Sequence, residues 1–289
     1  MGLSMTRIVY VNGEFVNEED AKVSVFDRGF LMADAVYEVT TVVDGKLIDY
    51  PAHMERLKRS LGELDMDEPA QIGDLLDIHR ELIGKNNITN GLIYLQVSRG
   101  VADRDFAYPE AGTPTSLVLF TQAKNPLENK LAETGARVIT VPDQRWGRRD
   151  IKTTQLLFPS MAKMMAKKAG VDDAWLEEDG FINEGTSNNT WIVTKDGKLV
   201  TRHLSNSILH GITRRATLRC AELLQLEVEE RPFTKEEAAN ANEAFFTSAS
   251  AFVCPVVEID GHPIGEGKPG SVVTRLREIY LEEAMKEAV

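Results

Sequence analysis

Cysteine and long apolar runs are both scarce in this sequence. It holds two cysteines in 289 residues. Cys220 lies in a predicted amphipathic helix and Cys254 in an apolar strand, so we expect two buried thiols rather than a disulfide. No apolar run approaches the ~18 residues of a membrane span, and the N-terminus lacks the basic and then apolar layout of a secretory signal. These absences favour a reducing cytoplasm.

Positive charge and clustered histidine are also in short supply. Thirty-three Lys and Arg residues face 45 Asp and Glu residues, for a net charge of -12. This balance argues against nucleic acid or an anionic membrane as the main partner. The five histidines are scattered singly, so no metal site is expected. Residues 1–6 match the N-myristoylation pattern, but Met5 as the native start is the better interpretation.

The remaining composition is that of an ordinary globular protein, with 43% hydrophobic and 27% charged residues. Hairpin turn signals recur at Asn12-Gly13, Asp44-Gly45 and Asp196-Gly197. They outnumber strand–helix–strand units, which favours two α+β domains over a doubly wound sheet. We predict a small domain over residues 1–121, a linker over 122–131 and a larger domain over 132–289.

Hydrophobic periodicity places the individual elements. We predict a helix opening at Pro51 and further helices at 72–83, 159–169, 213–224 and 272–286. We predict strands at 7–11, 14–16, 35–43, 46–49, 92–97, 116–121, 137–141, 173–177, around Glu184, and at 190–194, 243–248 and 256–259.

Lys152 is the first candidate for chemistry. It lies between a predicted strand and helix, with Trp146 before it and the apolar residues 156–158 after it. A lysine amine can form a Schiff base with the aldehyde of pyridoxal phosphate. Once freed, it can carry a proton between the substrate carbon and the cofactor. The alternative is a solvated surface lysine, which is the ordinary position of this residue type.

A carboxylate and a helix N-terminus complete the set that pyridoxal phosphate needs. Glu184 opens the polar segment 184–189 and could face the pyridine nitrogen, although it could also be a turn carboxylate after Asp179-Gly180. Residues 211–213 precede a predicted helix, with Thr213 as its N-cap, and suit a phosphate. An ordinary helix cap is the alternative there. Residues 248–250 could add donors to the same phosphate or form a polar turn.

Together these motifs resemble the fold-type IV (class IV) pyridoxal-phosphate-dependent aminotransferases, and most closely the D-amino-acid aminotransferases. The resemblance covers nearly the full length and rests on DRGF at 27–30, DAVYEV at 34–39, HMERL at 53–57, DIK at 150–152, NEGTSNN at 183–189 and GITR at 211–214. It implies that Lys152 holds the cofactor and that Glu184 pairs with the ring nitrogen. It implies further cofactor contacts at Arg56, Thr186, Ser187, Asn188, Leu209, Gly211, Ile212, Thr213, Ser248, Ala249 and Ser250. Arg56 and the backbone at residues 212, 213 and 249 would bind the phosphate, and Leu209 would support the ring face.

Substrate choice depends on the N-terminal domain. The resemblance places Tyr37 at the substrate carboxylate, with Val39 in the same segment. The arginine-x-histidine pair of D-amino-acid enzymes falls on Arg104 and Phe106, so phenylalanine replaces the histidine. Arg104 could hold a carboxylate by a bidentate fork, or it could be a solvated loop arginine. The replacement weakens carboxylate binding or marks specificity for another amine donor.

We therefore expect a cytoplasmic, homodimeric transaminase of α+β, two-domain fold-type IV architecture. It would move the amino group of a D-amino acid to a 2-oxo acid by a ping-pong mechanism. The alternatives within the fold are a branched-chain (L) aminotransferase, an (R)-amine transaminase and an aminodeoxychorismate lyase. A catalytically silent binding module is the alternative of another class, and the complete set of Lys152, Glu184 and Arg56 argues against it.

Overall fold

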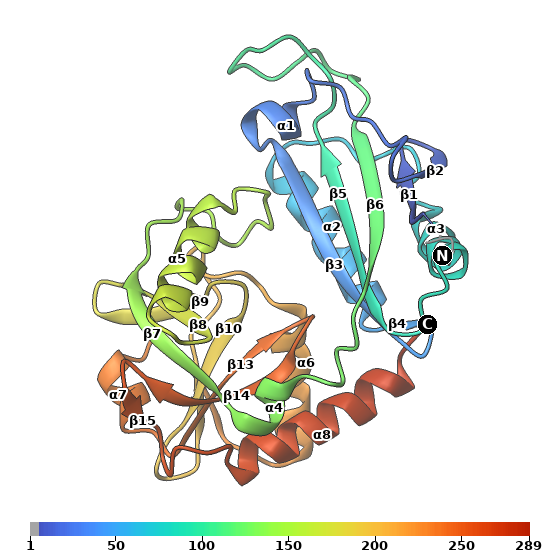
Figure 1. Ribbon diagram of the computed structural model, residues 1–289. Helices are drawn as coiled ribbons and strands as arrows, with labels where there is room; N and C mark the ends of the chain where they lie inside the picture. Colours follow the sequence, from blue (N-terminus) through green and yellow to red (C-terminus); the bar gives the residue numbers. More distant parts are fainter. Residues whose placement is uncertain (1–5) are drawn as a thin grey trace. The chain divides into compact units, whose positions relative to one another are not determined.

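The chain forms two compact units in the computed structural model, which describes residues 6–289 (Figure 1). Unit 1 contains the described residues up to Asn125, together with Ile151–Gln155 and Ala288–Val289. Unit 2 contains Pro126–Asp150 and Leu156–Glu287. The first division falls inside the predicted linker, whereas the Lys152 segment groups with unit 1 instead of with residues 132–289. The N-myristoylation pattern and the proposed start at Met5 lie outside the described residues, apart from Thr6.

Unit 1 is built on an antiparallel sheet of six strands within residues 6–125, in the order β2-β1-β6-β5-β3-β4. Its elements are β1 (Ile8–Val11), β2 (Glu14–Asn17), α1 (Arg28–Met32), β3 (Ala35–Val43), β4 (Lys46–Leu47), α2 (Tyr50–Glu63), α3 (Leu75–Lys85), β5 (Gly91–Ser98) and β6 (Ser116–Ala123). The predicted hairpin turn is confirmed, because Asn12 and Gly13 take φ values of 49° and 106° that favour Asn and Gly.

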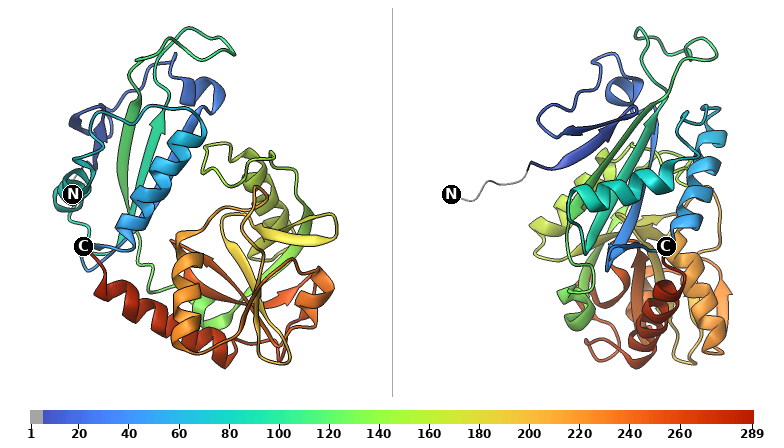
Figure 2. Two further views of the ribbon diagram at one scale, coloured as in Figure 1. Left: turned by 180° about the vertical axis from the view of Figure 1, so that it is seen from behind. Right: turned by 90° about the vertical axis from the view of Figure 1, so that its right-hand side faces the viewer.

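Helices α2 and α3 cover one face of this sheet (Figures 1 and 2). Leu57 and Leu61 of α2 are buried at the spacing that predicted the helix. α3 begins at Leu75 and not at the predicted residue 72, because the chain from 69 to 74 forms turns. The other sheet face carries half-buried side chains, including Tyr37 and Val39 of β3.

Unit 2 is built on a mixed sheet whose strands, among the described residues, run in the order β12-β11-β10-β13-β14-β7-β8-β9, with β15 beside β14. Its strands are β7 (Ala136–Pro142), β8 (Asp173–Glu178), β9 (Phe181–Gly185), β10 (Asn189–Val193), β11 (Leu199–Thr201), β12 (Val228–Glu230), β13 (Glu243–Ser248), β14 (Phe252–Ile259) and β15 (His262–Pro263). Its helices are α4 (Lys130–Thr134), α5 (Leu157–Lys168), α6 (Ile212–Leu223), α7 (Lys235–Ala239) and α8 (Ser271–Lys286).

Buried apolar side chains from these strands and helices form the core of unit 2. Trp175 and Phe233 meet edge to face inside it, and the stacked rings of Trp191 and Phe245 lie 5.4 Å apart. Parallel pairs join β7 to β8 and to β14, and β11 to β12, while the other pairs in this sheet are antiparallel. The predicted α+β class is therefore confirmed.

Six short elements were not predicted from the sequence, because their periodic signal is too brief. α1, α4 and α7 contain five residues each, β11 and β12 three each, and β15 two. α7 nevertheless carries a capping box, in which Thr234 and Glu237 satisfy each other's backbone amides. Cys220 and Cys254 are buried and form no disulfide, as predicted. Within residues 6–289, no helix combines the length and the hydropathy that crossing a bilayer requires.

Candidate active site

Lys152 lies on a short extended segment that pairs with the edge of β3 in unit 1. Its carbonyl accepts from the backbone N–H of Tyr37 at 3.0 Å, and the N–H of Thr154 donates to the carbonyl of Ala35 at 3.1 Å. This edge is open to the segment because β4 pairs only with the far end of β3. The Lys152 side chain is half-buried, and its Nζ lies 4.2 Å from the centre of the Tyr37 ring. The structure thus brings two predicted site residues together.

The sheet face beside Lys152 is aromatic. The ring of Tyr37 stacks on that of Tyr94 at 5.4 Å, and Tyr94 stacks on Phe120 at 4.9 Å. The Tyr94 hydroxyl donates to Oε1 of Gln96 at 2.8 Å, and burial raises the pKa of this hydroxyl. Val39 pairs with Tyr94 across the strands and shares the face. These half-buried side chains form a surface that an apolar group can pack against.

Arg56 lies on the opposite, helix-covered side of β3. Its Nε and Nη2 donate to the two carboxylate oxygens of Glu38 at 2.8 and 2.7 Å, and Nδ1 of His53 lies 2.7 Å from Oε2. Burial alone would raise the pKa of Glu38, but Arg56 and then His53 lower it to about 2. The predicted phosphate-binding arginine is therefore fixed by a buried bidentate ion pair.

Replacing Glu38 with glutamine is expected to destabilise the protein by about 3–5 kcal/mol, because it leaves Arg56 buried without a carboxylate. The depressed pKa makes the stabilisation by Glu38 fully present above pH 4.5, and acid removes it progressively as the pH falls to about 2. Urea unfolding at neutral and acid pH measures both effects. Glu18→Gln, in an exposed pair with Arg7, is the control and should cost less than about 1 kcal/mol. Equal midpoints for both variants would contradict the prediction.

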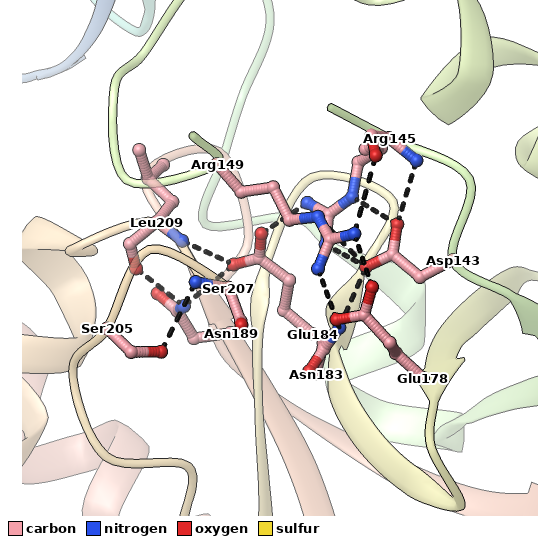
Figure 3. Close-up of polar contacts among 10 residues, drawn as sticks. All are labelled: Asp143, Arg145, Arg149, Glu178, Asn183, Glu184, Asn189, Ser205, Ser207 and Leu209. Atoms are coloured by element: carbon pink, nitrogen blue, oxygen red, sulfur yellow. Dashed lines mark hydrogen bonds and ion pairs between the residues drawn. The ribbon is translucent and has the colours of Figure 1, made fainter. Parts of the chain in front are cut away.

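Glu184 lies at the end of β9 in unit 2 and is buried. Its Oε2 accepts from Nδ2 of Asn189 and from the backbone N–H of Leu209, both at 3.0 Å. Its Oε1 accepts from Nη1 of Arg145 (Figure 3). A carboxylate has about four lone-pair positions, so three donors leave room for one more. Burial raises the pKa of Glu184, and the Arg145 charge opposes that shift.

The polar segment after Glu184 is held mainly by Asp173. Thr186 Oγ1 and Asn188 Nδ2 donate to the two carboxylate oxygens of Asp173 at 2.6 and 2.7 Å. Ser187 between them is exposed. A Cβ on Gly185 would lie 2.2 Å from Oδ1 of Asn188, so the turn requires glycine. The hydroxyl of Thr186 and the amide N–H₂ of Asn188 thus shape the loop, which leaves its backbone and Ser187 for a ligand.

The N-cap of α6 is Gly211, and not Thr213 as predicted. Gly211 has extended backbone angles, whereas Thr213 already lies inside the helix. The first-turn N–H groups of an α-helix have no partner within the helix. In α6, no side chain caps this end either. A Cβ on Gly211 would lie 2.0 Å from Oδ1 of Asn189, whose Nδ2 bonds Glu184. The same asparagine therefore packs against the helix end and orients the carboxylate.

Ser248 is the last residue of β13, and Ala249 and Ser250 follow it. The Ser248 hydroxyl accepts from the N–H of Ala251 at 3.2 Å, so it closes its own turn. Ser248, Ala249 and Ser250 are half-buried. Their contact with a phosphate stays a prediction.

Arg104 and Phe106 lie on an exposed loop of unit 1. The Phe106 ring is 79% exposed, and the Arg104 guanidinium lies 5.3 Å from its centre. The loop backbone is fixed by the buried Arg28, whose Nη1 donates to the carbonyls of Asp105 and Ala107 at 2.8 and 3.2 Å. Arg28 thereby fixes the backbone on both sides of Phe106, so the exposed ring projects from a turn that hydrogen bonds hold in place.

Three residues around Glu184 were missed by sequence reasoning: Asp143, Arg145 and the amide of Asn189. Asn189 belongs to the NEGTSNN motif at residues 183–189, but the pattern of helices and strands does not indicate what its side chain bonds. Asp143 and Arg145 follow β7, and only the sheet order places them near β9. The only sequence signal for this pair was an aspartate two residues before an arginine. That spacing is too common to identify a functional site.

Comparison with known proteins gives matches along almost the entire chain. The family model "Amino-transferase class IV" matches residues 35–259. The D-alanine aminotransferase of Staphylococcus haemolyticus is 39% identical, over 93% of this chain and 95% of that protein. The D-alanine aminotransferase of Bacillus licheniformis is 37% identical, over 96% and 99%.

Solved structures match along the same length. The branched-chain amino acid aminotransferase of Escherichia coli has a TM-score of 0.87 at 26% identity, over 96% of this chain and 95% of that chain. A second branched-chain amino acid aminotransferase, solved with pyridoxamine 5'-phosphate, has a TM-score of 0.88 at 28% identity and covers 98% of both chains.

Proposed function

The chain belongs to the class IV aminotransferases, which use pyridoxal phosphate, and we propose that it moves the amino group of a D-amino acid to a 2-oxo acid. The observation that carries the proposal is the match to D-alanine aminotransferases along nearly the whole chain. The pairing of Lys152 with the aromatic face at Tyr37 supports it, because the face gives a substrate side chain an apolar surface beside the amine.

The residues present fit the cofactor. The Glu184 carboxylate retains one acceptor position for a ring N–H. The uncapped first turn at Gly211, Ile212 and Thr213 suits a phosphate dianion. When bound, pyridoxal phosphate supplies an aldehyde that takes up an amine and a ring that accepts electrons from the substrate carbon.

Each residue has a defined task in this proposal. Lys152 holds the cofactor through its amine and, once released, takes the α-proton from one substrate and returns a proton to the other. Glu184 holds the ring-nitrogen proton. Arg56 and the N–H groups of residues 212, 213 and 249 hold the phosphate, and Leu209 supports the ring. Donor and acceptor use the same lysine in turn, so we expect ping-pong kinetics.

A single-turnover assay tests the substrate class. The holoenzyme is mixed separately with D- and L-alanine, D- and L-glutamate, D- and L-leucine, and (R)-1-phenylethylamine, and conversion of the cofactor to its amine form is followed by absorbance. Faster conversion with each D-enantiomer is expected. Preference for L-leucine would replace the proposal with a branched-chain aminotransferase, and conversion by the amine alone would replace it with an amine transaminase.

The second candidate, a branched-chain aminotransferase, is favoured by a specific observation. Several solved structures that are 26–28% identical to this chain carry that name, at TM-scores of 0.84–0.88. Their identity of 26–28% is lower than the 37–39% shared with D-alanine aminotransferases. Since these two groups share the fold, sequence similarity favours the D-amino-acid interpretation.

Replacing Arg104 with alanine is expected to lower the catalytic efficiency for D-amino acids by about 10- to 100-fold. A lost charge-assisted fork costs on the order of 1.5–3 kcal/mol. Steady-state kinetics with D-alanine measures the loss, and cofactor affinity should not change. Phe106→His should improve D-alanine, because histidine can donate a hydrogen bond where phenylalanine cannot.

Asp103→Asn serves as the control for a changed loop charge. If Arg104→Ala leaves D-amino-acid turnover intact and Phe106→His alters only an amine without a carboxylate, the D-amino-acid proposal fails. That pair of results would favour the amine transaminase.

We further propose a cytoplasmic homodimer. Large apolar side chains are exposed on α1, on the segment before it and on the loop of residues 101–108: Val23, Val25, Phe26, Phe30, Val101, Phe106 and Tyr108. The Asp27–Val101 bridge makes these segments neighbours, and exposed apolar side chains on neighbouring segments are typical of an interface. Sedimentation should give about twice the chain mass of 32.1 kDa, and an active monomer would contradict the proposal.

A further inference from the structure

We propose that Arg145 is a positioning residue that keeps the Glu184 carboxylate ionised, so that the proton shared with the cofactor ring resides on the ring nitrogen. This inference rests on the proposed function, in which Glu184 faces that nitrogen. It adds a role for Arg145 and a counteracting role for Asp143, both of which follow from the contacts in Figure 3.

The geometry fixes Arg145 between two carboxylates. Its Nε and Nη2 form a fork with Asp143 at 2.9 and 2.6 Å, while its Nη1 donates to Glu184. The side chains of Arg145, Glu184 and Asp143 are 12%, 4% and 0% exposed. The fork locks the plane of the guanidinium, so its remaining edge is directed at Oε1 of Glu184.

Burial makes this pairing decisive for the charge on Glu184. A carboxyl removed from water favours its neutral form. Burial raises the pKa of Glu184, while the charge and hydrogen bond of Arg145 lower it, and Asp143 adds a smaller rise. Of the groups that face this carboxyl, Asn189 and the Leu209 N–H are neutral donors, so Arg145 is the cation that opposes the effect of burial, which still leaves the pKa of Glu184 raised.

A second arginine limits how strongly Asp143 acts on Glu184. Nε of Arg149 lies 3.5 Å from Oδ2 of Asp143, and its other nitrogens donate to Glu178 at 2.6 and 2.8 Å. Asn183 donates to Asp143 at 2.9 Å. Burial raises the pKa of Asp143, but the Arg145 contacts outweigh it and leave the pKa lowered. Asp143 therefore stays ionised and partly neutralises Arg145.

Two substitutions should move the shared proton in opposite directions. Arg145→Met removes the cation that stabilises the carboxylate, so the proton moves from the ring nitrogen to Glu184. Asp143→Asn removes the anion that competes for Arg145, so the carboxylate becomes less basic and the proton stays on the nitrogen. A purely structural role for both residues would give changes of the same sign.

The test is ¹⁵N NMR of the holoenzyme loaded with ring-¹⁵N pyridoxal phosphate, recorded across a pH series. The nitrogen chemical shift distinguishes the protonated from the unprotonated ring. Arg145→Met should lower the midpoint of ring deprotonation by about 1–3 pH units. Asp143→Asn should raise it, and Arg145→Lys should keep much of the wild-type midpoint. Arg148→Met, which removes an arginine paired with Asp150, is the matched control.

The outcomes separate this inference from the proposed function. Wild-type protein that binds no cofactor would overturn the proposed function. Wild-type holoenzyme with a protonated ring, together with an unchanged midpoint in Arg145→Met, would overturn the role of Arg145 alone. If Arg145→Met does not fold, Asp143→Asn and Arg145→Lys decide. A midpoint that is lowered or unchanged in Asp143→Asn contradicts the inference, and so does a midpoint in Arg145→Lys that falls as far as removal of the cation predicts.

Discussion

Replacing Lys152 with alanine is expected to abolish transamination, with a loss of at least about 10⁴-fold, which combines lost covalent and acid–base catalysis. The variant should still fold. Lys152 is tied to β3 through its carbonyl, which accepts from the N–H of Tyr37, and alanine keeps that bond. The substitution therefore removes an amine without removing the segment that carries it.

Covalent trapping tests the assignment of Lys152 as the cofactor-binding lysine without relying on activity. Borohydride reduction of the holoenzyme followed by peptide mapping should place the cofactor on Lys152, and the alanine variant should yield no labelled peptide. Lys168→Ala, on the exposed end of α5, is the matched control and should keep both label and turnover. Label on Lys163, Lys167 or Lys168 would overturn the site assignment.

Glu184→Gln is expected to retain the cofactor but to lower turnover roughly 100-fold or more. This loss is comparable to that caused by removing one charge-stabilising group from a buried active site. Glutamine can still accept from Asn189 and Leu209, so the local fold should persist. It carries no charge to balance Arg145 or to hold a proton on the ring nitrogen. Turnover and the absorbance of the bound cofactor should change together.

Glu178→Gln provides the control for that variant. Glu178 is also paired with an arginine, Arg149, but its side chain is 37% exposed and it is not bonded to Glu184 in the network of Figure 3. The control should keep nearly normal turnover. Unchanged turnover in Glu184→Gln itself would show that another group serves the ring nitrogen.

Local patterns in the sequence determined most of the elements. Asn12-Gly13 predicts its hairpin because both residues tolerate positive φ, and the structure has that turn. Leu57 and Leu61 predict α2 because their spacing places them on one helical face. Motifs also singled out Lys152, Glu184 and Gly211, since an amine, a carboxylate and an open helix end are needed within one chain. Their roles stay predictions that the experiments above test.

Tertiary structure alone decided the partners of these residues. Arg145 meets Glu184 only because β8 pairs with both β7 and β9, which places the end of one strand beside the end of another. Arg56 meets Glu38 because α2 packs over β3. The sequence by itself determined turns, helical faces and the candidate chemistry, since those depend on near neighbours. The charge on a buried carboxyl depends on groups that long-range packing brings to it. The pairing of Arg145 with Glu184 could therefore be identified only in the folded chain.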